Sequence, residues 1–434
     1  MNLPFVVLPQ RYAELIAESG DDYGALWMQW NGREHIGVVD GFRQRLDGSS
    51  RKGLSDVPQR LHLADARSFE MGRWFRVDAQ LHLQAYAAHL RRHKMRLDAF
   101  QELALGPWFG LARGAFSLAV TVTELPDDRG LDFAAWRLLP DENTAELVSV
   151  EIVPEEVDLL EPVEGTWPIT ELASKTVIVL GAGSIGGAVA QSLAGYGLRT
   201  QLLVDPDRLT RANFARHVVH PRNLGRHKAM ALADHLRDRD DSVRAEPLML
   251  NVIYDADDLR PALEEADIVV VATDGVASRR AADYLARRAG KPAVFACVLA
   301  DGAFGEILRI RPPRTGCLLC VRRKMIDAGA MNPEPSLDRG YGTGSPHLPM
   351  TAVRGDLELV SQLAAKATVA TLLEPLGYRE QRLPGNQAII GLRPKPGMAV
   401  PFDIEHAGEV RWHDLPAPRE DCPNCGSRAP RRVT

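Results

Sequence analysis

The sequence predicts an α/β protein: a doubly wound, largely parallel sheet over residues 166–434, preceded by a small α+β domain over residues 1–165. Three observations lead to this prediction. An apolar run leads into glycines in G-x-G-x-x-G spacing, strand-like apolar runs then alternate with helical stretches, and two C-x-x-C pairs follow. Alternation of this kind is typical of a parallel sheet covered by helices on both faces.

The stretch from Thr176 to Lys228 organises the chain. Gly181, Gly183 and Gly186 open a helix rich in small residues, and a second apolar run ends at Asp205. Such glycines let the backbone approach a phosphate, and the first N–H groups of the helix favour an anion. Asp205 is then placed to accept hydrogen bonds from ribose hydroxyls. On its own, this Rossmann-like fingerprint is only moderately specific, because most such units hold a dinucleotide for redox chemistry.

Composition limits the function classes. The 434 residues suffice for two or three domains, and a net charge of -5 gives no overall attraction to nucleic acid. No run of about 18 uninterrupted apolar residues predicts a membrane span. The N-terminus lacks a basic segment followed by a long apolar core, so we expect no secretion signal. Four of the five cysteines lie in C-x-x-C pairs, which suits metal binding in a reducing cytoplasm.

The N-terminal region contains alternating apolar stretches that predict strands at 25–28, 35–39, 117–122, 131–136 and 147–153. Between them, residues 78–97 have helical spacing. The predicted core face of this helix consists of Leu81, Leu83, Ala85, Tyr86 and Leu90. Residues 154–168, rich in Glu and Pro, predict a linker.

The second region alternates strands and helices. Strands are predicted at 244–253, 266–273, 292–299 and 305–310, with edge strands at 386–393 and 409–415. Helices are predicted at 228–237, 275–289 and 357–373. Residues 325–350 are irregular and long for a connection, so we expect them to be functional or mobile.

The two cysteine pairs are the strongest single signal. Cys317, Cys320, Cys422 and Cys425 suit a closed tetrahedral site, and we expect structural Zn²⁺ there. Reactive thiols are the alternative. The fifth cysteine, Cys297, lies inside an apolar run and is predicted to be a small core residue.

As a set, the motifs resemble the ThiF/MoeB family of adenylating enzymes, which includes the ubiquitin-activating enzymes. The resemblance covers roughly residues 165–430. It rests on GAGSIG at 181–186, DPD at 205–207, NFAR at 213–216, GRHK at 225–228, TD at 273–274, CLLC at 317–320 and CPNC at 422–425.

This resemblance implies an ATP site with specific roles. Adenylation brings a carboxylate against the α-phosphate, so cations are needed, and Arg216 and Lys228 are the candidates. Asp274, after a central strand, would hold Mg²⁺. Asp205 would hold the ribose and Asn213 would lie near the phosphates. Asp207 and the three glycines complete the cofactor-binding set. Alternatively, Arg216 and Lys228 lie on a solvated loop and bind no phosphate, and Asp274 caps the N-terminus of the next helix.

The chain departs from the family at several points. Residues 325–350 contain no cysteine, although family members that form a thioester usually keep one there. Three explanations stay open: the reaction stops at the acyl adenylate, Cys297 is the thiol, or a natural cysteine has been substituted. His217 stands where the family often has Gln, and 165–175 lacks the expected arginine finger. His217, His220 and His227 are expected to be loop residues, solvated or beside phosphate, rather than metal ligands.

By the resemblance, the substrate is a ubiquitin-like protein with a C-terminal glycine, and the enzyme is a cytoplasmic homodimer. The N-terminal domain weakly resembles a JAB-type deubiquitinase-like domain, but His62, His82, His89 and His93 lack the metal-binding spacing. It is expected to be a platform for the modifier or a conjugating enzyme, within a bacterial conjugation pathway that could serve phage defence. The alternatives are a sulfur-carrier or peptide-antibiotic-precursor adenylyltransferase, an NAD-dependent oxidoreductase and a degenerate binding scaffold.

Overall fold

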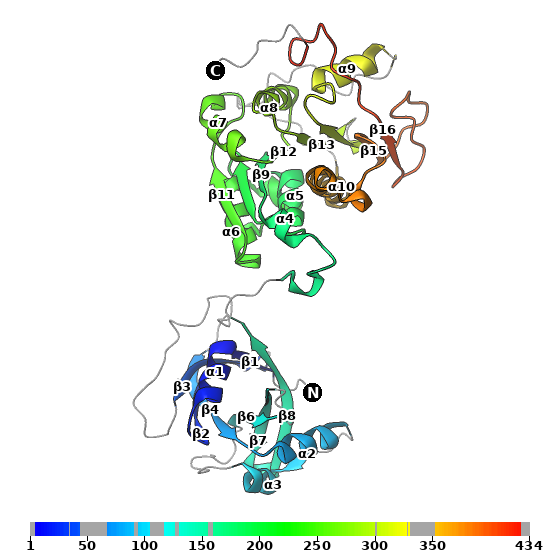
Figure 1. Ribbon diagram of the computed structural model, residues 1–434. Coiled ribbons are helices and arrows are strands. Elements are labelled where there is room, and N and C mark those ends of the chain that lie inside the picture. The colour runs from blue at the N-terminus through cyan, green and yellow to red at the C-terminus, as the bar shows by residue number, and fades with distance from the viewer. Residues whose placement is uncertain are drawn as a thin grey trace. The chain divides into compact units, whose positions relative to one another are not determined.

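The computed structural model describes residues 5–33, 35–43, 67–90, 94–104, 117–125, 130–154, 159–299, 302–327, 329 and 352–426. Its contacts divide the chain into two units, Met1–Val157 and Asp158–Thr434 (Figure 1). The boundary predicted at residue 165 falls inside the second unit, just after the 3-10 turn Glu161–Val163. None of the helices in the described ranges has the length and apolarity needed to cross a membrane.

The first unit is an eight-stranded sheet in the order β1-β3-β2-β4-β6-β7-β8-β5, and β1 also pairs with β8. The strands are β1 Phe5–Pro9, β2 Tyr23–Asn31, β3 Ile36–Arg43, β4 Arg67–Arg76, β5 Met95–Arg96, β6 Ser117–Glu124, β7 Leu131–Leu139 and β8 Thr144–Val153. The helices are α1 Gln10–Glu18, α2 Ala79–Leu90 and α3 Leu97–Leu103. One core cluster includes Tyr12 and Ile16 of α1, and the other includes residues of α2 and α3.

The helix predicted at 78–97 is wrong in length and in its core face. It ends at Leu90, and β5 and α3 follow. Leu81 and Ala85 are buried as predicted, whereas Leu83, Tyr86 and Leu90 are 67%, 40% and 84% exposed. Polar contacts occupy part of the predicted core face: buried His82 is hydrogen-bonded to Asp132 and Thr121, and Tyr86 Oη donates to the same Asp132 at 3.3 Å. The five predicted strands are confirmed within β2, β3, β6, β7 and β8.

The second unit is an α/β fold with strand order β11-β10-β9-β12-β13-β14-β15-β16. The strands are β9 Thr176–Leu180, β10 Thr200–Val204, β11 Arg244–Leu248, β12 Ile268–Val271, β13 Ala293–Leu299, β14 Phe304–Ile310, β15 Gln387–Gly391 and β16 Val410–His413. The first five in spatial order pair in parallel and the last three are antiparallel.

Helices cover both faces of this sheet. They are α4 Ile169–Ala173, α5 Ser184–Gly195, α6 Lys228–Arg239, α7 Ala256–Glu265, α8 Val276–Arg288, α9 Leu318–Asp327 and α10 Arg354–Leu373. Residues of α5, α6 and α10 enter one core cluster, and residues of α7, α8 and α9 enter the other (Figure 1).

Strand β9, which leads into the glycine turn, lies between β10 and β12. The chain adds β10 and β11 on one side of β9 and then β12 and β13 on the other, so the turn lies at a topological switch point. In open α/β sheets, ligands bind beyond the carboxyl ends of the strands at such a point. The strand predicted at 244–253 is shorter, since β11 ends at Leu248. Of the segment predicted at 325–350, residues 325–327 belong to α9, and 328 and 330–350 lie outside the described residues.

Candidate functional site

The glycine turn lies against the sheet on one side and is open on the other. Gly181 has φ +94°, and a Cβ there would lie 2.8 Å from the carbonyl oxygen of Ala272. A Cβ on Gly186 would lie 1.8 Å from the carbonyl oxygen of Gly181. Gly183, which caps α5, has no atom within 4 Å of its would-be Cβ. Two glycines therefore serve packing, and the third faces the space that a ligand could enter.

Asp205 joins the end of β10 to this turn. Its Oδ2 accepts a hydrogen bond from the N–H of Ala182 at 2.9 Å, and its Oδ1 accepts one from the N–H of Asp207 at 2.9 Å. The side chain is 8% exposed. Burial raises the pKa of Asp205, while the Lys228 charge and the two N–H donors act in the opposite direction. The carboxylate is thus a fixed edge of the site with lone pairs left over for a further donor.

Lys228, the first residue of α6, lies among acids from three segments. Its Nζ donates to Asp207 Oδ2 at 2.8 Å and lies 3.9 Å from Asp205 Oδ1. Burial lowers the pKa of Lys228, but Asp205, Asp207 and Asp274 outweigh it, so the pKa is raised and the side chain is a cation. Asp274, which follows a different strand, also acts electrostatically on Lys228.

Asp274 lies in the turn between β12 and α8 and is exposed. The next residue, Gly275, caps α8 with φ +86°. Ser278 Oγ donates to the carbonyl oxygen of Asp274 at 2.5 Å, and Arg279 Nε donates to that of Gly275 at 3.0 Å. Side chains of α8 therefore fix the backbone of the turn and leave the Asp274 carboxylate facing outward.

Asn213 has a local role that the motif did not predict. Its Oδ1 accepts hydrogen bonds from the backbone N–H and the hydroxyl of Thr210, at 2.7 and 3.0 Å. This reciprocal cap fixes the 3-10 turn Arg211–Ala215 between Asp205 and α6. Arg216 follows this turn and is partly exposed. Contact of Asn213 and Arg216 with phosphate stays a prediction.

His217, expected to be a loop residue that is either solvated or beside phosphate, is buried. It is 2% exposed, its Nε2 donates to the carbonyl oxygen of Ala182 at 2.7 Å, and its Nδ1 accepts from the N–H of Val219 at 3.3 Å. Burial lowers the pKa of His217 to about 4, so the imidazole is neutral. It connects the loop before α6 to the glycine turn. The apolar pair Val218-Val219 after it was the available signal for burial.

The four cysteines meet at one point. The Sγ–Sγ distances are 4.0 Å for Cys317–Cys320, 3.5 Å for Cys317–Cys422 and 3.3 Å for Cys320–Cys425. All four sulfur atoms lie within 4.8 Å of one another. A tetrahedral ion with bonds of about 2.3 Å needs sulfur atoms about 3.8 Å apart, so this donor set fits Zn²⁺.

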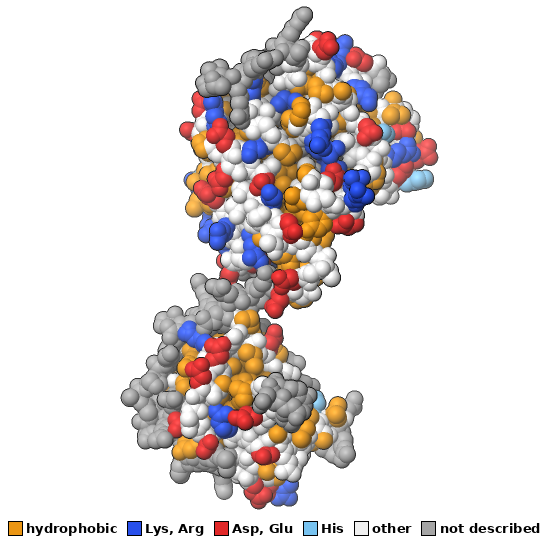
Figure 2. Space-filling model, in the orientation of Figure 1, with side chains coloured by type: hydrophobic (Ala, Val, Ile, Leu, Met, Phe, Trp, Pro, Cys, Tyr) orange, Lys and Arg blue, Asp and Glu red, His pale blue; other side chains and the backbone are white. Residues whose placement is uncertain are grey.

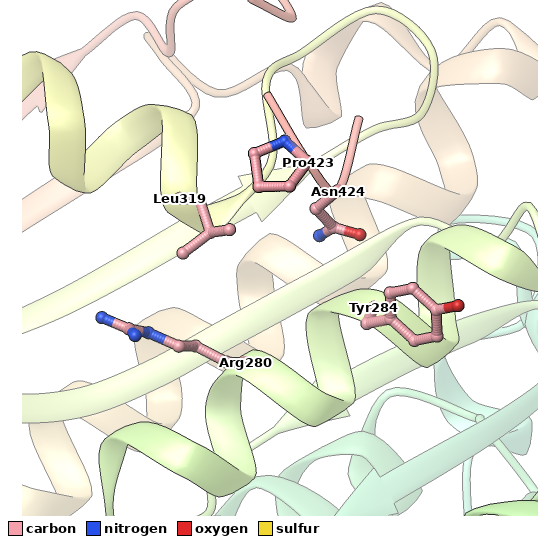
Figure 3. Close-up of a pocket in the computed structure, with 5 residues that line it drawn as sticks. All are labelled: Arg280, Tyr284, Leu319, Pro423 and Asn424. Carbon is pink, nitrogen blue, oxygen red and sulfur yellow. The ribbon is translucent and has the colours of Figure 1, made fainter. Parts of the chain in front are cut away.

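The two cysteine loops are tied to α8 through Asp283. Its Oδ2 accepts from the N–H of Leu318 at 3.0 Å and from Asn424 Nδ2 at 2.7 Å. A shallow cavity of about 230 Å³ lies beside the loops. It is lined by Arg280, Tyr284, Leu319, Pro423 and Asn424 (Figure 3). Cys297 lies in β13 and is 7% exposed, so it is the core residue that the sequence predicted.

Comparison with known proteins identifies the second unit. Residues 160–374 match the model of the ThiF family. Adenylyltransferase and sulfurtransferase MOCS3 of Xenopus laevis is 30% identical over 176 residues, 40% of this chain and 38% of that protein. The ATP-dependent ubiquitin transferase-like protein Cap2 of Enterobacter hormaechei is 30% identical over 114 residues, 26% of this chain and 19% of that protein. The chain thus spans well under half of either relative.

A solved structure of Escherichia coli MccB with AMPCPP and SeMet MccA is also similar. The identity is 20% and the TM-score 0.45, over 59% of this chain and 68% of that chain.

His217 should make the fold acid-sensitive. The pKa of His217 in the folded protein lies below the usual value of 6.5. The stability that neutral His217 contributes is therefore fully present above about pH 6.5 and is lost as the pH falls towards 4. We expect a loss of about 1.4 kcal/mol in unfolding free energy between pH 7.5 and 5.5 that is absent in His217→Gln. Urea unfolding at both pH values measures it, with His406→Gln, at an exposed position, as control. Equal losses in wild type and His217→Gln would contradict this role.

The cysteine cluster should bind about one zinc ion per chain. Cys317→Ser or Cys422→Ser should lower the bound metal to near zero and lower the thermal midpoint, because metal affinity contributes directly to folding. Elemental analysis of purified protein and a thermal melt measure both quantities. Cys297→Ser, at a buried cysteine outside the cluster, is the matched control and should keep its metal. An undiminished zinc content in Cys317→Ser would show that the cluster is not the zinc site.

Proposed function

Residues 160–374 belong to the ThiF family, and on that basis we propose that this protein is an ATP-dependent adenylyltransferase acting on the C-terminal carboxylate of a ubiquitin-like protein. The observation that supports it most is the contact of Lys228 with Asp205 and Asp207, within electrostatic reach of Asp274, next to a glycine turn whose outer side, at Gly183, is open. The sheet is proposed to be a doubly wound, Rossmann-like nucleotide-binding sheet, with this turn at its switch point.

The proposed reaction is acyl adenylation. A carboxylate oxygen of the substrate attacks the α-phosphorus of ATP, a new acyl–phosphate bond forms, and the bond to the β-phosphate breaks so that pyrophosphate leaves. Two anions must approach each other, which requires positive charge at the α-phosphate. Lys228 is a partly buried cation at the site, and Arg216 is proposed as the second.

The remaining groups are proposed to hold the nucleotide. Asp205 and Asp207 would accept hydrogen bonds from the ribose, and the N–H groups at the start of α5, next to Gly181, Gly183 and Gly186, would bind phosphate. Asn213 would shape the loop that carries Arg216. Mg²⁺ would neutralise charge on the departing pyrophosphate, and the exposed carboxylate of Asp274 is the proposed ligand. The cysteine site would hold structural Zn²⁺.

A ubiquitin-like substrate is favoured by the similarity to Cap2 and by a separate N-terminal unit. That unit is proposed as a platform for the modifier or a conjugating enzyme. His82 is occupied by Asp132 and Thr121, which suits a unit without catalytic metal; His62 and His93 lie outside the described residues. The proposed setting is a bacterial, cytoplasmic conjugation pathway that serves phage defence.

A homodimer is also proposed. Apolar side chains gather on the face of the second unit seen in Figure 2. Exposed Val353 and Leu376 flank α10, and Leu359 on the helix itself is 44% exposed. Such surface suits burial between two copies.

The similarity to MOCS3 keeps a sulfur carrier as the second candidate substrate. Adenylation of a sulfur carrier is the same reaction as adenylation of a ubiquitin-like protein, and only the protein that is adenylated differs. A nicotinamide oxidoreductase gives no role to the Lys228 cluster and the cysteine site together.

ATP–pyrophosphate exchange tests the proposal. With a panel of glycine-terminated ubiquitin-like proteins and sulfur carriers, at least one partner should stimulate exchange. Asp274→Ala and Lys228→Ala should each reduce it by at least about 100-fold, because each removes a charge needed at the phosphates. Asp267→Ala, also at an acid next to β12 but at its opposite end, is the matched control. No exchange with any partner, together with tight NAD binding, would favour the oxidoreductase.

The glycine turn gives a second, sharper test. Gly183→Ala should fold normally, since its Cβ meets nothing within 4 Å and φ is -83°. It should still weaken ATP binding by about tenfold if phosphate contacts this backbone. Gly186→Ala should instead destabilise the fold by several kcal/mol, about 3 or more, because its Cβ would overlap a carbonyl oxygen. Calorimetric titration and thermal melts separate the effects; unchanged ATP affinity in Gly183→Ala would place the phosphates elsewhere.

A further inference from the structure

Asp283 is a buried acid that contacts both cysteine loops. It lies in α8, is 2% exposed, and accepts two hydrogen bonds on the same oxygen, Oδ2. One comes from the N–H of Leu318 at 3.0 Å and the other from Asn424 Nδ2 at 2.7 Å. Leu318 is the second residue of the first C-x-x-C pair, and Asn424 is the third residue of the second pair. A single oxygen atom therefore joins two loops that lie 105 positions apart in the chain.

The two cysteine pairs differ in how the rest of the fold holds them. The first pair lies at the start of α9, which is fixed to β14 because Arg322 Nη1 and Nη2 donate to Glu306 at 2.7 and 2.5 Å. The second pair lies in residues 414–426, which contain no helix or strand. Irregular segments are more mobile than helices and strands unless specific contacts hold them. The hydrogen bond to Asp283 is such a contact for the second pair.

Arg287, one turn further along α8, supports the first loop from the same helix. Its Nη2 donates to the carbonyl oxygen of Thr315, two residues before Cys317, at 2.9 Å. Helix α8 thus contacts the chain just before Cys317, just after it, and inside the second pair. Because all three contacts start from one helix, they fix the positions of the two loops relative to each other.

The position of Asp283 matches that of a group that orients metal ligands. A metal site binds its ion more tightly when its ligands are already in place, because less conformational freedom is lost on binding. Groups that hold the ligands by hydrogen bonds make this contribution without being ligands themselves. Both partners of Asp283 are N–H donors, so the role requires a hydrogen-bond acceptor rather than a negative charge.

We propose that Asp283 is a positioning residue for the metal site, which holds the two cysteine pairs in the arrangement that binds Zn²⁺. It is not one of the four ligands. The inference rests on the Zn²⁺ that the proposed function assigns to the cysteines, and it does not depend on the adenylation reaction.

Zinc affinity of the full chain, measured by competition with a chelator, tests this role. Asp283→Ala should weaken Zn²⁺ binding by about 10-fold to 100-fold, the usual effect of losing a group that orients metal ligands. Asp283→Asn should bind more tightly than Asp283→Ala, because its carbonyl oxygen can accept the same hydrogen bonds. The matched control is Tyr284→Phe, at the next residue of α8, which lines the cavity beside the loops (Figure 3) and should keep the wild-type affinity.

Asn424→Ala tests the same contact from the other side, and it decides the question if Asp283→Ala does not fold. Asn424 is partly exposed and lies in a loop, so the variant should fold. It should weaken Zn²⁺ binding by about tenfold. In the Asp283→Ala/Asn424→Ala double variant the two effects should be less than additive, because both single changes remove the same hydrogen bond.

Three results would overturn the inference: wild-type Zn²⁺ affinity in Asn424→Ala, an equal loss of affinity in Tyr284→Phe, or an Asp283→Asn variant no better than Asp283→Ala. A wild-type protein that binds no Zn²⁺ would end the inference together with the proposed metal site. Failure of the proposed reaction looks different. It would leave no ATP–pyrophosphate exchange with any partner, while the zinc affinities still changed as expected.

Discussion

The site depends on one constraint: the glycine turn after β9 must lie against the sheet and still stay open to a ligand. The backbone of Ala182 shows how this is achieved. Its N–H donates to Asp205 and its carbonyl accepts from His217, so two different segments hold one residue. Gly181 and Gly186 allow contacts that a Cβ would block, while Gly183 leaves the outer side free. The turn is fixed before a ligand arrives, so binding loses little conformational entropy.

Electrostatics then narrows what such a turn can bind. Lys228 contacts Asp207, lies near Asp205, and is within electrostatic reach of Asp274, so acids outnumber the cation. That balance would repel a bare triphosphate, and a divalent ion bound to the triphosphate would reduce this repulsion. This charge balance favours ATP bound together with Mg²⁺ and a further cation, such as Arg216, at the phosphates. A nicotinamide dinucleotide, with fewer charges, would not require the exposed Asp274.

The sequence was sufficient for features that are local and periodic. Apolar runs and glycine spacing predicted β9, β10, β12 and the turn, because these depend on near neighbours in the chain. Buried polar contacts between distant segments were not predictable. Asp283 binds Asn424 across 141 positions, and His82 of α2 binds Asp132 of β7. His217 lies in a loop as expected, but its burial was not predictable, because its partner, Ala182, is 35 positions away. Arg279 carried no motif signal, since its partner is a backbone carbonyl.

The buried pair of Glu306 and Arg322 has a consequence for the helix α9. Replacing a buried ion pair by apolar groups is often neutral for stability, so net stability alone does not account for it. Its effect is positional: α9 is held near its start by Cys320 and in its middle by Arg322. Helix α10, which resumes the chain, is held by Ser361, whose Oγ lies 3.3 Å from the carbonyl oxygen of Ile185 in α5. Helices α9 and α10 are therefore anchored within the second unit, α9 to β14 and α10 to α5.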